Sequence, residues 1–145
     1  MQLLDPKLIQ LDILASDWQS AIKKSAEPLI KEGVVTNNYP KSVIEIAEKN
    51  GPYIVIAPQI ALSHASITDG AIKNGLGLTV LSNPVKFGNK ANDPVRLVFT
   101  LSSIGDDVHL KQMSDLVSVL QEPKIVDKVV RSRTINEITQ LFNGR

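Results

Sequence analysis

The two histidines of the chain, His64 and His109, have the greatest potential for chemistry. Imidazole is nucleophilic and its pKa is near neutral, so a histidine can accept a phosphoryl group or a proton at physiological pH. His64 ends a short apolar segment, residues 60–64, and small or turn-forming residues follow it. This context predicts an exposed imidazole at the end of a strand, where a partner protein can reach it.

His109 follows Asp106 and Asp107 in the first turn of a predicted helix. Free backbone N–H groups and the positive end of the helix dipole favour an anion at that position. A nucleophile and an anion-binding turn are the parts that phosphoryl transfer needs. We therefore expect His64 and His109 to share one shallow depression, with Ser63 and Asp107 as candidate binding residues beside them.

Other chemistries find less support in the residues. Segment 70–75 has the glycine spacing of a phosphate-binding loop, but Leu76 occupies the place of the lysine that reaches the phosphates. Ser63 lies in no Gly-x-Ser-x-Gly turn, and successive residues of a strand point to opposite faces, so Ser63 and His64 do not suggest a hydrolytic triad. With two histidines and no cysteine, a metal site would depend on carboxylates, and we expect none.

The composition indicates a folded domain without a polyanionic partner. Of 145 residues, 43% are hydrophobic and 21% charged, and 16 basic against 15 acidic residues leave a formal charge of +1. We therefore expect no nucleic-acid binding. The absence of cysteine fits a reducing compartment, and no apolar run reaches the roughly 18 residues of a membrane span, so we expect a cytoplasmic protein without membrane insertion.

The pattern of apolar residues predicts helices in the first and last thirds of the chain and strands between them. Asp17 and Gly33 bound an amphipathic helix that Pro28 kinks or ends. Further helices are expected at 40–49, 107–120, 125–130 and 135–141. Strands are expected at 53–56, 60–62, 75–81 and 95–101, with a turn at Asn83-Pro84 and a short edge strand at 85–87. Residues 1–145 should thus form a single α/β domain, a mixed sheet of mostly short strands flanked by helices.

Two ordered blocks of sequence resemble a known family. Residues 51–65, Gly-Pro-Tyr-Ile-Val-Ile-Ala-Pro-Gln-Ile-Ala-Leu-Ser-His-Ala, are similar to the active-site region of enzyme IIA proteins of the sugar phosphotransferase system (PTS), mannitol/fructose superfamily. The Gly-Pro-Tyr-x-Val-Ile-Ala-Pro stretch resembles the ascorbate-type branch. Residues 85–88, 92–95 and 107–110 match, in order, the part of the family that bears a second active-site histidine. The resemblance extends from about Trp18 to Phe142.

The resemblance implies a mannitol/fructose-type IIA fold and a phosphotransferase component that forms a phosphohistidine. His64 would accept phosphate from the histidine-containing phosphocarrier protein and pass it to an enzyme IIB for sugar uptake. His109 would stabilise the phosphoryl group, and no metal or organic cofactor would take part. Partner docking also requires an apolar rim, to which we expect Ile60, Leu62, Ile67 and Leu110 to contribute exposed atoms.

The sequence departs from the family pattern at two places. Ser63 stands where a proline usually precedes the phosphorylated histidine, and segment 48–50, Glu-Lys-Asn, stands where mannitol-type members carry an active-site arginine. Two alternatives to a transport component stay open. The domain could be a regulatory IIA-like protein whose phosphorylation reports sugar supply, or an α/β interaction domain whose histidines are structural.

Overall fold

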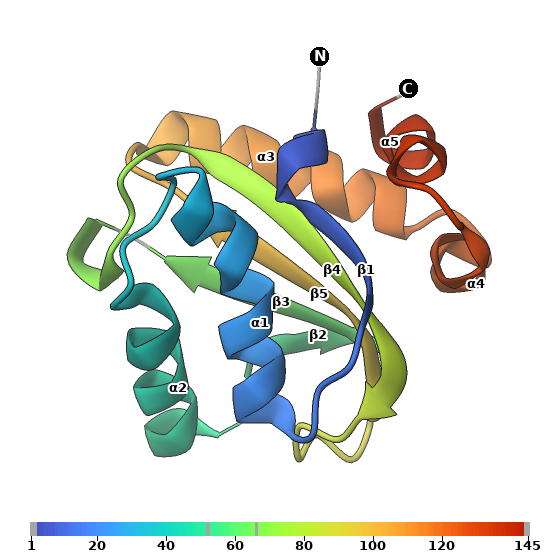
Figure 1. Ribbon diagram of the computed structural model, residues 1–145, viewed down its shortest axis with the longest axis horizontal. Helices are drawn as coiled ribbons and strands as arrows, with labels where there is room; N and C mark the ends of the chain where they lie inside the picture. Colours follow the sequence, from blue (N-terminus) through green and yellow to red (C-terminus); the bar gives the residue numbers. More distant parts are fainter. Residues whose placement is uncertain (1–2, 52, 66, 144–145) are drawn as a thin grey trace.

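The computed structural model describes residues 3–51, 53–65 and 67–143. Within these residues the chain forms five α-helices, five strands and two short 3-10 helices (Figure 1). In chain order they are η1 Pro6–Leu8, β1 Ile9–Ile13, α1 Trp18–Lys31, α2 Tyr39–Asn50, β2 Val55–Ala57, β3 Ile60–Ala65, η2 Ile67–Asp69, β4 Gly75–Val85, β5 Val95–Ser102, α3 Asp106–Leu120, α4 Ile125–Arg131 and α5 Ile135–Asn143.

The strands form one mixed sheet in the order β1-β4-β5-β3-β2. β1 is parallel to β4, and β3 is parallel to β5, whereas the pairs β4–β5 and β2–β3 are antiparallel. β5 therefore lies at the centre, and its burial is nearly complete along its whole length. A strand buried on both faces reads as a continuous apolar run, which is why Val95–Ser102 was recognisable in the sequence.

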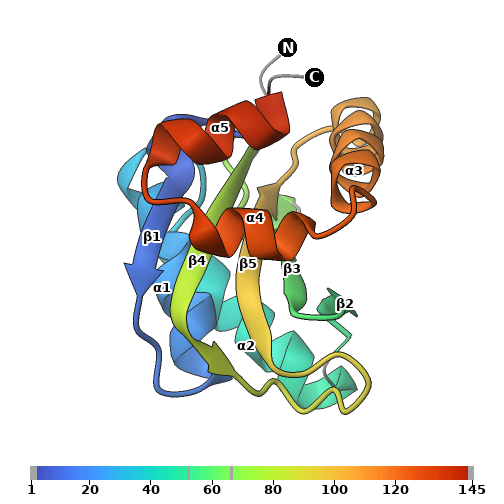
Figure 2. The same ribbon diagram turned by 90° about the vertical axis from the view of Figure 1, so that its right-hand side faces the viewer.

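Helices cover both faces of the sheet, so the molecule has three layers (Figures 1 and 2). On one face, α1 and α2 enclose a core that includes Ile22, Leu29 and Tyr39. On the other face, α3, α4 and α5 enclose a second core that includes Leu116 and Phe142. The mixed sheet flanked by helices that the sequence predicts is confirmed.

Helix α1 shows how the sequence sets the element bounds. The side chain of Asp17 accepts a hydrogen bond from the backbone N–H of Ser20 at 2.8 Å, which is the N-cap that the sequence predicts. Pro28 lies inside α1 and does not end it, since the helix continues to Lys31. Gly33 then adopts a φ of +71°, a left-handed conformation that favours glycine after a helix.

The N-terminal third is not entirely helical, because residues 9–13 form the edge strand β1, which the sequence analysis missed. The alternation of Ile9, Leu11 and Ile13 with polar residues is a strand signal. One polar residue of this strand, Gln10, donates from Nε2 to Thr79 Oγ1 at 2.8 Å on the neighbouring β4. This pattern covers only five residues, and its pairing with β4 makes it a strand.

The turn expected at Asn83-Pro84 is also wrong, because β4 continues through it to Val85. The register between β4 and β5 shifts between Val80 and Val85, and proline is tolerated at such irregularities. Asn83 serves a different purpose, since its Nδ2 donates to the carbonyl of Ala15 at 3.0 Å and holds the loop before α1. Residues 85–87 accordingly form no separate edge strand.

Candidate functional site

His64 lies near the C-terminal end of β3, and its side chain is exposed. It is paired with Leu101 of β5 in a parallel register. Ile60 and Leu62 pack in the core beneath α3, α4 and α5. Because alternate residues of a strand share a face, His64 projects on this same side of the sheet. The expectation of an exposed histidine at a strand end is confirmed.

The start of α3 lies at the same edge of the sheet as His64. β3 and β5 are parallel, so their C-terminal ends meet at one edge, and three residues connect Ser102 at the end of β5 to Asp106 at the start of α3. In Figure 1 the end of β3 and the beginning of this helix lie on the same, left-hand side of the molecule. The N-cap residue is Gly105, which has no side chain to occupy the first N–H groups of the helix. These groups can therefore receive an anion.

Asp107 and His109 both lie in the first turn of α3, as expected. Their side chains fall outside the part of the chain that the structure describes. The backbone thus brings the two histidine-bearing segments to one edge and one face of the sheet. The approach of the two imidazole rings stays a prediction.

Ser63 does not share the exposed face with His64. Its side chain is fully buried and points to the side of α1 and α2, where its hydroxyl lies 2.6 Å from the hydroxyl of Tyr39. Burial raises the pKa of Tyr39 well above its usual range, so this phenol remains protonated. Ser63 is therefore placed behind His64, and a direct contact of its hydroxyl with a phosphoryl group on the other face is not supported.

The segment after His64 is bound to the loop before α2 and to the first turn of that helix. The backbone N–H of Thr36 donates to the carbonyl of Gly70 at 2.9 Å, and the hydroxyl of Ser42 donates to Asp69 Oδ1 at 3.2 Å. Gly70 has a φ of +106°, and a Cβ at this position would lie 2.5 Å from Thr36 Oγ1. The close approach therefore requires glycine, and the two loops are held in contact.

The apolar rim around the site is only partly as expected. Leu110 is 65% exposed on α3, but Ile60 and Leu62 are buried in the core beneath the same helix, so their proposed place in the rim is wrong. The side chain of Ile67 lies outside the described residues. Ile60, Leu62 and His64 alternate along β3 and so share one face of the sheet. Ile60 and Leu62 are buried in the core beneath α3, and only His64, the last of the three, is exposed. Ile104 and Val117, each 45% exposed, are rim candidates that the sequence analysis missed.

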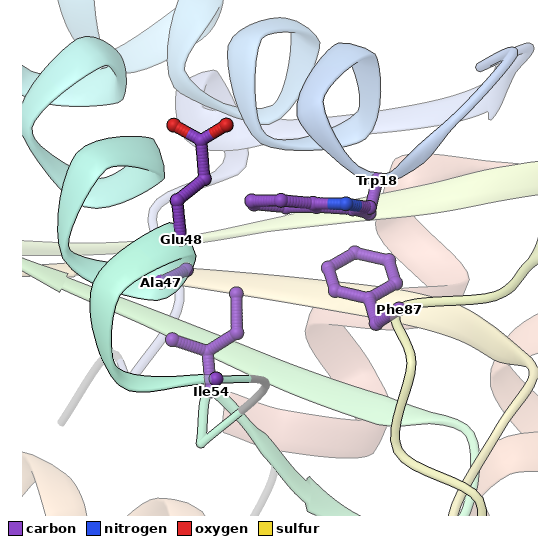
Figure 3. Close-up of a pocket in the computed structure, with 6 residues that line it drawn as sticks. Trp18, Ala47, Glu48, Ile54 and Phe87 are labelled. Carbon is purple, nitrogen blue, oxygen red and sulfur yellow. The ribbon is translucent and has the colours of Figure 1, made fainter.

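A hollow lies at the end of the sheet opposite to His64. It has a volume of about 230 Å³ and lies between α1, α2 and the segments before β2 and after β4. Figure 3 shows the rings of Trp18 and Phe87 on one side of it and Ala47, Glu48 and Ile54 on the other. Phe87 follows the end of β4 that pairs with Val95, whereas His64 pairs with Leu101 at the far end of β5. This hollow is separate from the histidine site.

The residues that the structure describes contain neither a metal-binding cluster nor a membrane-spanning helix. No group of three or more histidine, cysteine or acidic side chains there could hold a metal ion. No helix in the same residues is long and apolar enough to cross a membrane.

Comparison with known proteins identifies the class that this fold and site define. Residues 2–144 match the family described as phosphoenolpyruvate-dependent sugar phosphotransferase system, EIIA 2, and the chain belongs to this family. Members are phosphotransferase components with a phosphohistidine intermediate, and this chain is therefore such a component. The resemblance inferred from residues 51–65 and 107–110 is confirmed at the level of the family.

Individual relatives agree with this assignment. The ascorbate-specific PTS system EIIA component of Escherichia coli K12 is 30% identical over 142 residues, covering 97% of this chain and 92% of that protein. The cryptic mannitol-specific phosphotransferase enzyme IIA CmtB from E. coli has a solution structure similar to this one, with a TM-score of 0.87, 29% identity and full coverage of both chains. The fold is also that of mannitol IIA in its complex with phosphorylated enzyme IIB from E. coli, with a TM-score of 0.83, 22% identity and 98% coverage of both chains.

Proposed function

We propose that His64 is the phosphorylated residue of this IIA component, and that it accepts phosphate from the histidine-containing phosphocarrier protein. The phosphoryl group then passes to an enzyme IIB during uptake of an ascorbate-type sugar. The observation that carries the proposal is the exposed side chain of His64 at the end of β3, beside the start of α3. The ascorbate-specific relative supports the sugar class, and the mannitol IIA–IIB complex supports the acceptor.

The proposed transfer exchanges one nitrogen–phosphorus bond for another. A ring nitrogen of neutral His64 attacks the phosphorus of the donor phosphohistidine in line. The donor nitrogen leaves with the electron pair of the broken bond. In the second transfer the nucleophile of enzyme IIB attacks this phosphorus, the bond from phosphorus to His64 breaks, and the ring nitrogen of His64 leaves with the electron pair. Such transfer depends on positioning and charge stabilisation more than on covalent chemistry by the protein.

The first turn of α3 supplies the charge stabilisation in this proposal. Its backbone N–H groups and the helix dipole face the edge where His64 lies, and Gly105 leaves those groups uncovered. His109 would add a hydrogen bond to a phosphoryl oxygen. Asp107, in the same turn, is retained as a candidate binding residue. No metal or organic cofactor enters the scheme.

Docking of both partners would use the exposed apolar residues around the site. Ile104 precedes α3, and Leu110 and Val117 lie on α3 itself. Positions 110 and 117 are separated by two helical turns and therefore share one side of the helix. Transient protein contacts often bury less than about 1,200 Å² in total and have an apolar centre, which such a surface can supply. Because both proposed partners act in the cytoplasm, the proposal includes a cytoplasmic location for this chain.

The proposal is tested by incubating the protein with phosphoenolpyruvate, enzyme I and the phosphocarrier protein, followed by intact mass measurement. We expect the mass of one phosphoryl group to be gained on His64 and to be lost in acid. Adding enzyme IIB should then remove it. Stable incorporation at another residue, or none in the complete system, would contradict the assignment.

A further inference from the structure

We propose that Tyr39 is a positioning residue for phosphoryl transfer, acting through its buried hydrogen bond to Ser63. The inference rests on the proposed function of His64. Tyr39 touches none of the reacting atoms. It holds the backbone at the end of β3, and this backbone sets the orientation of the neighbouring imidazole.

The hydrogen bond joins two hydroxyl groups that have no access to solvent. Tyr39 and Ser63 are both 0% exposed, and their oxygens lie 2.6 Å apart. A buried hydroxyl without a partner is costly, so each group constrains the other. The ring of Tyr39 is packed in the core formed by α1, α2 and the sheet, which fixes the position of its hydroxyl. The hydrogen bond therefore connects the end of β3 to a rigid anchor.

The site of attachment is the residue directly before His64. Ser63 and His64 occupy successive positions of the β3–β5 ladder and so project to opposite faces. Displacement of the Ser63 backbone would tilt the His64 side chain on the other face. Ser63 is also the position at which the sequence departs from the proline of similar proteins, so the constraint on this peptide comes from a side-chain hydrogen bond.

The start of α2 holds the chain on the other side of His64 as well. Ser42 binds Asp69, and Thr36 binds the carbonyl of Gly70. Tyr39 lies between these two residues in the sequence, and its own backbone N–H donates to the carbonyl of Thr36 at 3.1 Å. Segment 36–42 thus contacts residue 63 before the histidine and residues 69–70 after it. Both attachments fix His64 relative to α2, so loss of one should change its presentation without unfolding the domain.

The experiment compares Tyr39→Phe, Ser63→Ala and the double variant with the wild-type protein. The matched control is Ser25→Ala, which removes another buried hydroxyl, bonded to the carbonyl of Ile22 at 2.8 Å within α1. For each protein one measures the melting temperature and the pre-steady-state rate of phosphorylation over a range of phosphorylated phosphocarrier concentrations. The saturating rate and the half-saturating concentration are then separated. Imidazole ¹⁵N NMR reports the environment of His64 in the unphosphorylated protein.

We expect Tyr39→Phe and Ser63→Ala each to lower the saturating rate by about three- to tenfold, with little change in the half-saturating concentration. The double variant should lose no more than either single variant, because one hydrogen bond is removed in all three. The His64 resonances should shift in these variants. Ser25→Ala should keep the wild-type rate and spectrum, although its melting temperature also falls.

Unchanged rates and His64 resonances in Tyr39→Phe and Ser63→Ala, with melting temperatures lowered as in Ser25→Ala, would overturn the inference and leave the hydrogen bond a purely structural one. So would additive losses in the double variant. Failure of the proposed function gives a different result, since the wild-type protein would then take up no phosphate, or His64→Ala would take it up normally.

Discussion

The two ends of the central sheet differ in whether their apolar side chains are exposed or buried. At the C-terminal ends of β3 and β5, His64 and Leu110 project from the surface, and the N-cap of α3 is Gly105, which has no side chain. At the opposite end, Phe87 is 6% exposed and packs against Trp18, with ring centroids 6.3 Å apart. The first end exposes polar and apolar groups, whereas the second covers its largest apolar groups. Substitutions at the two ends should therefore affect different measurements.

The largest effect should follow His64→Ala, which we expect to abolish phosphorylation. No atom would remain at this position to form the nitrogen–phosphorus bond. His64→Gln should be equally inactive, although it keeps a polar side chain. Mass gain and acid-labile phosphate are measured for both variants under identical donor concentrations. Normal modification of either variant would remove the functional distinction between the two ends of the sheet.

His109→Ala should have the next largest effect, a loss of about a hundred- to a thousand-fold in the rate of phosphorylation. One donor to the phosphoryl group is removed, but the nucleophile and the N–H groups of α3 remain. His109→Gln should retain part of the rate because its amide can donate a hydrogen bond. Time courses of mass gain give the rates. If His109→Ala takes up no phosphate while His64→Ala is modified normally, the roles of the two histidines are reversed.

Leu110→Gln should have a smaller effect on phosphorylation. The two ends of the sheet can be compared directly here, because a leucine of similar exposure lies at the other end. We expect an increase of about fivefold in the half-saturating concentration of the phosphocarrier protein, from loss of apolar contact. The saturating rate and the melting temperature should hardly change, since Leu110 is 65% exposed. Leu14 is 66% exposed and directly follows β1 at the opposite end of the sheet, so Leu14→Gln is the control. Equal effects of the two substitutions would argue against docking at α3.

Much of the fold was predictable because its strongest signals are local. Asp17 and Gly33 mark a helix through cap chemistry, and β5 is apolar enough to be read as a central strand. β1 and the extension of β4 past Asn83 were missed, since both depend on pairing between strands distant in sequence. The turn propensity of a residue pair such as Asn83-Pro84 shows that a turn is possible there, but pairing with neighbouring strands decides whether one forms.

The candidate site was predictable to a similar degree. The exposure of His64 followed from its place at the end of an apolar segment, and the helix start at Asp106 followed from helical periodicity. The burial of Ile60 and Leu62 did not follow, because it depends on α3 packing over the face that they share with His64. The contact between Tyr39 and Ser63 has no sequence signal either, since 24 positions separate the two residues. Long-range packing of this kind requires the structure.

The smallest effect on phosphorylation, and a large one on stability, should follow Phe87→Ala at the aromatic end. Loss of the buried ring next to Trp18 should lower the free energy of unfolding by about 3 kcal/mol, measured by urea denaturation. The phosphorylation rate, measured well below the melting temperature, should stay near that of the wild-type protein because the substitution lies at the end of the sheet remote from His64. Phe87→Leu, which keeps most of the apolar contact, should recover much of the stability. A strong loss of phosphorylation in a folded Phe87→Ala protein would show that the two ends are coupled through the sheet, and that positioning of His64 depends on more than its attachment to α2.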